Sequence, residues 1–264
     1  MFKHRTSPFM FPHLKMISDY TLKRKKIIGE GGSATVYEAD ASYADYVHRH
    51  SMYSDRLAVR VMITRGLDWT KEIEINQYLN FHEIAHIVPL VHWMAKDEYG
   101  KSVDGFYNTL DDAKELDGWI EVHMTYPLMA TALLDCRRFT RKQKIDVVFQ
   151  LISMVKSLHR HRICHNDMGF KNILYRKDGE YIHLFLTDFG ESRMECTDFE
   201  LDYRQLVNNI LFIVYDVPFY KLKDNEDIPR DIRELLMILQ YEAAPYLLDQ
   251  LEALFVAQRD HESQ

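Results

Sequence analysis

The sequence predicts an α+β protein with a mainly β amino-terminal half and a mainly α carboxy-terminal half. Short runs rich in β-branched residues fill the first half, and an amphipathic run of about twenty residues opens the second. Helical spacing of apolar residues then continues to the end. The halves meet near residues 126–128, so we expect two lobes with a ligand-binding cleft between them.

Length and composition are those of an ordinary globular protein. The chain has 264 residues, of which 47% are hydrophobic and 28% charged, which allows one large or two small domains. Its 33 basic and 40 acidic residues give a net charge of −7, a poor balance for neutralising nucleic-acid phosphates. No apolar run approaches the ~20 residues needed to cross a bilayer. We therefore expect neither a nucleic-acid partner nor a membrane span.

Three cysteines, Cys136, Cys164 and Cys196, are far apart in the sequence and odd in number. This pattern argues against a disulfide framework, and the apolar run before Cys164 suggests a small buried residue there. The aromatic start is interrupted by Pro8 and Pro12, which is not typical of a signal peptide. We expect a cytoplasmic protein, or one in a host cytosol if a non-classical route secretes it.

Residues 1–20 are expected to be an extension and residues 21–126 an amino-terminal lobe. The acidic stretch 97–118 within this lobe is expected to be an exposed insert or a long hairpin connection. Strands are predicted over residues 25–29, 34–39, 56–63, 87–95 and 119–128, and a helix over residues 69–81.

Residues 127–264 are expected to form a shortened, mainly helical lobe. A long amphipathic helix is predicted over 142–161, followed by a hairpin over 172–189 that turns at Asp178-Gly179. Helical patterning follows Leu201, and Pro245 is expected to divide the last run into two helices. These terminal helices could dock a protein partner, although packing against their own lobe is the simpler use.

A glycine-rich turn lies between the first two predicted strands. It reads Gly-Glu-Gly-Gly-Ser-Ala-Thr-Val from Gly29 to Val36, with Ala34 where a third glycine is usual. Glycines let the backbone approach a ligand closely, and free N–H groups in such a turn suit phosphate oxygens. A plain hairpin turn is the alternative. The strand-to-strand position disfavours a dinucleotide-binding turn, which leads into a helix.

The run Ala58-Val59-Arg60 and the acid Glu72 form a second candidate site. A buried cation held by a helix carboxylate could clamp the α- and β-phosphates of a nucleotide. Glu72 lies on the apolar side of the predicted helix, whereas the helical period turns Glu74 away. An ordinary strand residue and a solvated acid are the alternative.

The strongest motif is the loop His-Asn-Asp-Met-Gly-Phe-Lys-Asn, residues 165–172. Its Asp167 and Asn172 are five residues apart, so one can orient a hydroxyl nucleophile while the other ligates a metal. Thr-Asp-Phe-Gly at 187–190 ends the predicted hairpin and adds the carboxylate of Asp188 near Asn172. Oxygen ligands of this kind, completed by phosphates and water, suit Mg²⁺.

These motifs, in this order and at these spacings, resemble the eukaryotic-type protein kinase family over roughly Thr21 to Tyr215. The resemblance implies a bilobal fold, with an antiparallel sheet and one helix in the first lobe and a helical second lobe. It implies ATP and Mg²⁺ as ligands, and residues 124–128 as the hinge that contacts adenine. The residues it implies for nucleotide binding are Gly29, Gly31, Gly32, Ser33, Ala34, Val36, Ala58, Arg60, Glu72 and Tyr126.

The same resemblance assigns catalytic roles. Asp167 is the expected base, Asn172 and Asp188 are the expected Mg²⁺ ligands, and Lys171 and Arg60 are the expected catalytic cations. Three further residues have supporting roles by the same resemblance: Asp202 beneath the catalytic loop, with His165 and Phe189 stacked under the site.

The chain departs from the family's usual pattern at several positions. Arg60 replaces the third-strand lysine, and its planar guanidinium cannot substitute for an ammonium without moving. Asn166 replaces the arginine that pairs with a phosphorylated loop. About a dozen residues separate Gly190 from Asp202, and no A-P-E element is visible. A phosphorylation-controlled loop is therefore not expected.

We accordingly expect an ATP- and Mg²⁺-dependent serine/threonine protein kinase that is not controlled by activation-loop phosphorylation. The substituted Arg60 keeps open a pseudokinase that serves as a partner-binding module. The short segment keeps open a small-molecule kinase of the aminoglycoside or choline type. The sequence does not identify the protein substrate.

Overall fold

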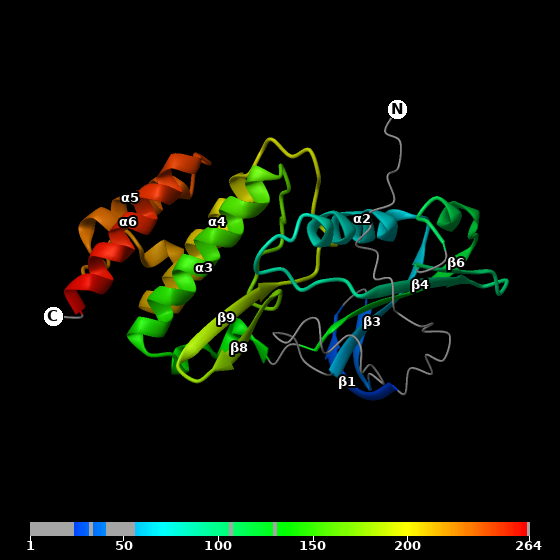
Figure 1. Ribbon diagram of the computed structural model, residues 1–264. Coiled ribbons are helices and arrows are strands. Elements are labelled where there is room, and N and C mark those ends of the chain that lie inside the picture. Colours follow the sequence, from blue (N-terminus) through cyan, green and yellow to red (C-terminus); the bar gives the residue numbers. More distant parts are fainter. Residues whose placement is uncertain (1–23, 32–33, 41–55, 106–107, 129–130, 263–264) are drawn as a thin grey trace. The chain divides into compact units, whose positions relative to one another are not determined.

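The computed structural model describes residues 24–31, 34–40, 56–105, 108–128 and 131–262 (Figure 1). It divides into two compact units, one of residues 1–66 and 91–129 and the other of residues 67–90 and 130–264. The expected extension 1–20, and Gly32 and Ser33 of the glycine turn, lie outside the described residues.

The first unit is built on a six-stranded antiparallel sheet with the strand order β1-β2-β3-β6-β4-β5 (Figure 1). Its buried side chains include Leu57, Val59, Trp93, Val122 and Met124. The strands are β1 (Arg24–Glu30), β2 (Ala34–Asp40), β3 (Arg56–Arg65), β4 (His92–Asp97), β5 (Ser102–Asp104) and β6 (Trp119–Pro127).

The predicted strand over 87–95 is shorter in the structure and begins at His92. The preceding residues pair elsewhere: Ile87 forms an isolated parallel bridge with Leu186, and the Val88 amide donates to the Leu186 carbonyl at 2.9 Å. These residues belong to the second unit, because their backbone groups are satisfied by its hairpin.

The acidic insert is a structured connection over its described residues. It contains β5 and a short 3-10 helix, η2 (Asp112–Glu115). Asp97 is 6% exposed, and its carboxylate accepts hydrogen bonds from the amides of Tyr99, Lys101 and Asp117 at 3.1, 2.8 and 3.4 Å. At least this acid therefore organises the turn rather than only facing solvent.

The second unit packs helices around one hydrophobic core beside a three-stranded sheet (Figure 1). The long helix starts at Arg141 because Thr140 and Gln143 form a capping box. The predicted break at Pro245 is confirmed, with Pro245 as the first residue of the last helix. The helices are α2 (Asp68–Phe81), η3 (Leu133–Arg138), α3 (Arg141–Arg160), α4 (Glu200–Ile210), the π-helical η4 (Leu211–Tyr215), η5 (Phe219–Lys221), α5 (Arg230–Leu239) and α6 (Pro245–Glu262).

The predicted hairpin is confirmed as β8 (Ile173–Asp178) and β9 (Tyr181–Leu186), and β7 (Thr131–Ala132) adds a third strand. Gly179 has a φ of +59° in the turn, a conformation that glycine adopts without steric cost. The second strand ends two residues before Asp188, so the hairpin carries one candidate ligand to the site.

The expectation for the cysteines was wrong in part. Cys164 and Cys196 form a disulfide with a Cα–Cα distance of 5.8 Å, while Cys136 is free and buried. The two residues are 32 apart in sequence. An antiparallel bridge between Cys164 and Arg193 brings their segments together, and sequence spacing alone does not reveal such a bridge.

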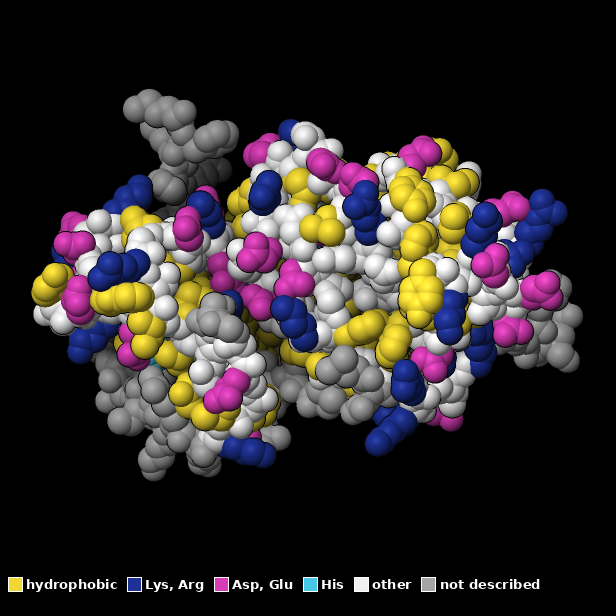
Figure 2. Space-filling view, turned by 180° about the vertical axis from the view of Figure 1, so that it is seen from behind, with side chains coloured by type: hydrophobic (Ala, Val, Ile, Leu, Met, Phe, Trp, Pro, Cys, Tyr) yellow, Lys and Arg dark blue, Asp and Glu magenta, His cyan; other side chains and the backbone are white. Residues whose placement is uncertain are grey.

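Charged side chains of both signs are interspersed with hydrophobic ones over the face shown in Figure 2. Among the helices that the structure describes, none has the length and hydropathy of a bilayer-spanning segment.

Candidate active site

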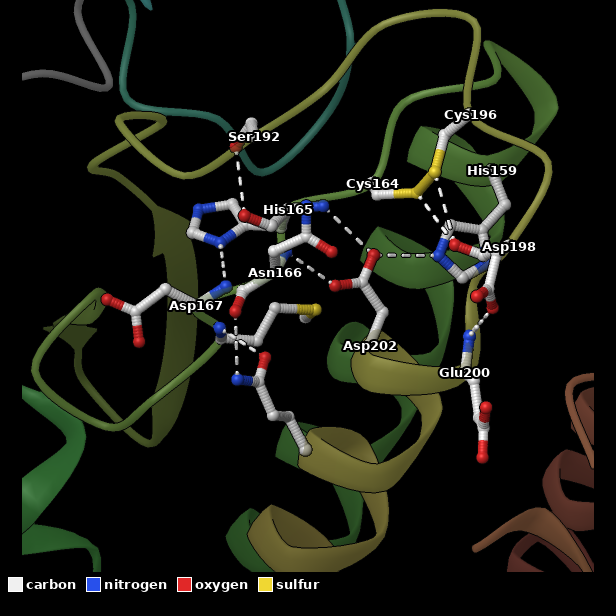
Figure 3. Close-up of polar contacts among 12 residues, drawn as sticks. His159, Cys164, His165, Asn166, Asp167, Ser192, Cys196, Asp198, Glu200 and Asp202 are labelled. Carbon is white, nitrogen blue, oxygen red and sulfur yellow. Dashed lines mark hydrogen bonds and ion pairs between the residues drawn. A yellow bond between two sulfur atoms is a disulfide. The ribbon is translucent and has the colours of Figure 1, made fainter. Parts of the chain in front are cut away.

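A buried carboxylate at the start of α4 organises the loop that follows α3 (Figure 3). Asp202 is completely buried and accepts hydrogen bonds from the amides of His165 and Asn166 at 2.9 and 2.7 Å. The Nε2 of His159 lies 3.0 Å from the same carboxylate. Three donors therefore converge on Asp202, and they fix the backbone entering the loop.

His165 fixes the next residue of the loop through both ring nitrogens. Its Nδ1 accepts from the Asp167 amide at 3.2 Å, and its Nε2 donates to the Thr187 carbonyl at 3.1 Å. This arrangement requires the neutral imidazole, because Nδ1 can accept only without a proton. Burial lowers the pKa of His165, which favours the same neutral form. Its ring also packs edge-on against the ring of Phe189, with the ring centroids 4.8 Å apart.

Asp167, Asn172 and Lys171 form one polar cluster. The Asn172 amide nitrogen donates to the backbone oxygen of Asp167 at 2.8 Å and to its carboxylate at 2.9 Å. The Lys171 ammonium lies 3.0 Å from that carboxylate, and this hydrogen bond raises the pKa of Lys171. The Asp167 side chain is 30% exposed, so it is held in place yet open to a reactant.

Asp188 is brought to this cluster by backbone pairing. The amide of Thr187 donates to the carbonyl of Asn172 at 3.0 Å, which places Asp188 one residue from that contact. The Asn172 side-chain nitrogen is engaged with Asp167, and its amide oxygen accepts no hydrogen bond from the described residues. An amide oxygen and a carboxylate are hard donors, so Asn172 and Asp188 fit Mg²⁺.

Two residues of the site have left-handed backbone conformations. Asn166 has a φ of +64° and Asp188 a φ of +65°. Asparagine and aspartate tolerate this region better than other non-glycine residues, but it still costs free energy. At Asn166 the side chain offsets part of that cost by donating to the carbonyl of Glu191 at 2.9 Å.

In the first unit, the strand register places several predicted nucleotide-binding residues on one face of the sheet. Val36 pairs with Gly29 and with Arg60, Arg60 pairs with Met124, and Ala58 pairs with Tyr126. Residues opposite one another, and residues two apart on a strand, share a face. The Gly31 amide donates to the Ala34 carbonyl at 2.9 Å, a bond that joins the two ends of the glycine turn.

Arg60 and Glu72 lie in different units. Arg60 is half-buried on β3, whereas Glu72 is 3% exposed on α2, where its neighbour Glu74 is exposed. The choice of Glu72 as the buried acid of this helix agrees with the structure. The ion pair between Arg60 and Glu72 stays a prediction.

Two residues that hold the loop, Gln205 and Asn209, are not predicted by the sequence motifs. Gln205 accepts from the Met168 amide at 2.6 Å and donates to the Asn166 carbonyl at 3.1 Å, while Asn209 donates to the Met168 carbonyl at 2.8 Å. With Asp202 they occupy positions i, i+3 and i+7 of α4. Polar residues on one stripe of a helix with apolar neighbours could have signalled this role.

The chain resembles several known proteins. The protein kinase domain model matches residues 22–205. The chain is 26% identical over 174 residues to a calcium/calmodulin-dependent protein kinase, cmkA, of Emericella nidulans, and 23% identical over 180 residues to serine/threonine-protein kinase PLK4 of Drosophila persimilis. These alignments cover 64% and 66% of this chain but 34% and 19% of those relatives. The chain thus spans about a third of their length or less.

The solved ROP18 kinase domain, in complex with AMP-PNP and sucrose, has a similar structure. It matches with a TM-score of 0.58 at 16% identity, over 90% of this chain and 82% of that one. This likeness shows the fold: an antiparallel sheet and a helix in the amino-terminal part, and a helical carboxy-terminal part. Since the family model also matches more than half of the residues, the chain belongs to the protein kinase domain family.

Proposed function

We propose that the chain is an ATP- and Mg²⁺-dependent phosphotransferase that acts on serine or threonine hydroxyls of a protein. The observation that carries this proposal is the arrangement of Asp167. Its backbone is bonded to His165 and Asn172, and its side chain lies against Asn172 and Lys171. A carboxylate held in this way is ready to orient an incoming hydroxyl before any reactant binds.

In the proposed reaction the acceptor hydroxyl oxygen forms a bond to the γ-phosphorus of ATP. The bond from that phosphorus to the β,γ-bridging oxygen breaks, ADP leaves, and Asp167 receives the hydroxyl proton. Lys171 lies at the carboxylate and supplies positive charge where negative charge gathers on the transferred group. Asn172 and Asp188 would hold Mg²⁺, which supplies further charge neutralisation on the phosphates.

We assign nucleotide binding to one face of the first unit's sheet and to the glycine turn. Ala58 and Tyr126 would contact the base, and Gly29, Gly31 and Val36 would cover the phosphates. Arg60, paired with Glu72, would align the phosphates. The shared face of these sheet residues in the strand register supports this assignment.

The proposed kinase needs no phosphate on its loop. Asn166 has no charge for a phosphate to pair with, and its side chain is already bonded to Glu191. The segment from Gly190 to α4 is short and is held by backbone bonds to residues 162–164. We place this activity in a cytoplasm, its own or that of a host, where ATP is available.

Transfer of radiolabelled γ-phosphate tests the proposal directly. The full chain is incubated with labelled ATP and Mg²⁺, with itself, with generic protein acceptors and with aminoglycosides and choline. We expect label on protein, and we expect Asp167→Asn to abolish it while Asp178→Asn, an exposed acid in the hairpin turn, does not. Label on small molecules alone would refute the protein acceptor and favour a small-molecule kinase. No label on any acceptor would refute the proposal that the chain is an enzyme.

A pseudokinase is the second candidate because Arg60 stands where the family carries lysine. In that case the terminal helices α5 and α6 would be the partner-binding surface. Transfer by the wild-type chain separates the two candidates. Arg60→Lys should keep or raise transfer by an enzyme; in a chain that transfers nothing, it should create transfer only if Arg60 is the defect. A Mg²⁺-dependent rise in melting temperature with ATP, lost in Asp188→Ala, supports nucleotide binding. No shift at millimolar ATP favours the partner-binding module.

A further inference from the structure

The disulfide joins two segments that already run side by side (Figure 3). Cys164 and Arg193 exchange two backbone hydrogen bonds, each at 3.0 Å, and the Cys196 amide donates to the Arg162 carbonyl at 2.8 Å. The Ser192 hydroxyl donates to the His165 carbonyl at 3.1 Å. Residues 191–196 thus lie along the approach to the catalytic loop, and the sulfurs meet where this pairing ends.

Both ends of this link lead to groups that position Asp167. Cys164 directly precedes His165, whose amide is bonded to Asp202 and whose ring anchors Asp167. Cys196 lies two residues before Asp198, whose carboxylate accepts from the Glu200 amide at the first turn of α4. The helix that carries Asp202 is therefore tied through the disulfide to the loop that Asp202 supports.

The same site accommodates the reduced pair. The carbonyl oxygen of Asp198 lies 3.0 Å from the Cys164 sulfur and 3.1 Å from the Cys196 sulfur. A thiol at either position has an acceptor there, so reduction leaves no buried donor unpaired. The Cα–Cα distance of 5.8 Å lies in the range that a disulfide spans without backbone movement. Cys164 is buried, but Cys196 is half-buried and offers an attacking thiolate a route to the bond.

We propose that Cys164 and Cys196 are a reversible dithiol–disulfide pair that fastens residues 190–198 to the catalytic loop. Two thiols and one low-molecular-weight disulfide exchange to give the Cys164–Cys196 bond and two small thiols: the protein is oxidised, the small disulfide is reduced, and one proton moves with each thiol. The disulfide would hold residues 190–198 in place, as an ion pair between a loop phosphate and an arginine does in kinases that carry arginine at the position of Asn166. The oxidised form is the ordered, active one, so in a reducing cytoplasm the pair rests as thiols and oxidation raises the activity; this last statement rests on the proposed function.

A proteolysis experiment tests the pair without any use of kinase activity. The full chain is equilibrated in buffers of reduced and oxidised glutathione, and the linkage is measured by alkylation and peptide mass. Trypsin is then added, and cleavage after Arg193 is followed, because that bond lies between the two cysteines and can be cut only when the segment opens. We expect cleavage in the oxidised form to be slower by about tenfold or more. Cys196→Ser should cleave at the reduced rate in every buffer, whereas Cys136→Ala should follow the wild type.

Three results would overturn the proposal: no Cys164–Cys196 linkage in excess oxidised glutathione, a linkage that excess reduced glutathione cannot open, or equal cleavage rates in the two forms. A separate arm measures γ-phosphate transfer at each redox poise, and we expect reduction to lower it. Redox-dependent cleavage without any transfer would refute the proposed kinase and leave the thiol pair standing. Transfer that is equal in both forms would refute the regulatory role.

Discussion

The structure predicts that Asp202 is a principal source of stability for the catalytic loop. Its completely buried carboxylate accepts from two backbone amides and lies within hydrogen-bonding distance of His159 Nε2. Asp202→Ala would leave those donors buried without acceptors. An unpaired buried donor costs about 1–3 kcal/mol, so after partial entry of water we expect a loss of about 3–5 kcal/mol in the free energy of unfolding.

Urea denaturation of wild type and variants measures this loss. Glu200→Ala is the matched control, since Glu200 lies in the same first turn of α4 and forms an exposed ion pair with Arg204. Such pairs contribute about 0–1 kcal/mol, and the control should lose no more than that. Asp202→Asn retains one acceptor oxygen and should fall between the two. If Asp202→Ala unfolded within about 1 kcal/mol of the wild type, the argument that buried donors need this carboxylate would be refuted.

Three further predictions follow from burial and charge. The Tyr203 hydroxyl is buried and has no hydrogen-bond partner among the residues that the structure describes, and burial raises its pKa to about 12. Tyr203→Phe should therefore raise the free energy of unfolding by about 1 kcal/mol, measured by urea denaturation. Burial lowers the pKa of His165 and of His86, so the unfolded chain binds more protons than the folded one below histidine's ordinary pKa of about 6.5. The urea midpoint should be stable near pH 7.5 and fall as the pH decreases through 6. Lys171→Met should leave the unfolding free energy within about 1 kcal/mol, because the side chain is 69% exposed, yet lower γ-phosphate transfer by about 100-fold.

A specific result would contradict each of these three predictions. A destabilised Tyr203→Phe would mean that the hydroxyl is paired. A midpoint unchanged between pH 7.5 and 5.5 would mean that His86 and His165 are protonated as readily in the folded chain as in the unfolded one. A Lys171→Met enzyme with full transfer would remove that cation from the reaction.

Local chemistry made much of the fold predictable. The long helix, the break at Pro245 and the Asp178-Gly179 turn follow from periodicity, proline and positive φ, which are properties of a few neighbouring residues. The strand over 87–95 was only partly right, because Ile87 and Val88 pair with Leu186, a residue about a hundred positions away. Local patterning carries no information on such a partner.

The candidate active site also has one part that the sequence predicts and another part that depends on distant residues. The order of the motifs indicated Asp167, Asn172 and Asp188, whereas the groups that hold them required tertiary structure. The disulfide is the clearest case. Spacing and an odd count argued against it, yet the backbone bridge between Cys164 and Arg193 brings Cys196 beside Cys164. Gln205 and Asn209 were missed because amide side chains on a helix are usually solvated.

The evidence for an active kinase and the evidence for a pseudokinase come from different units of the chain. Every contact described above that orients Asp167, from Asp202 through His165 to Asn172 and Lys171, comes from the second unit. A pseudokinase that had lost selection for catalysis would not need a base whose side chain and backbone are both held. The departure that favours a pseudokinase, Arg60, lies in the first unit, on the sheet face assigned to the nucleotide. A chain with intact Asp167 contacts and no transfer would therefore be defective in nucleotide alignment, and Arg60→Lys is the substitution that would restore it.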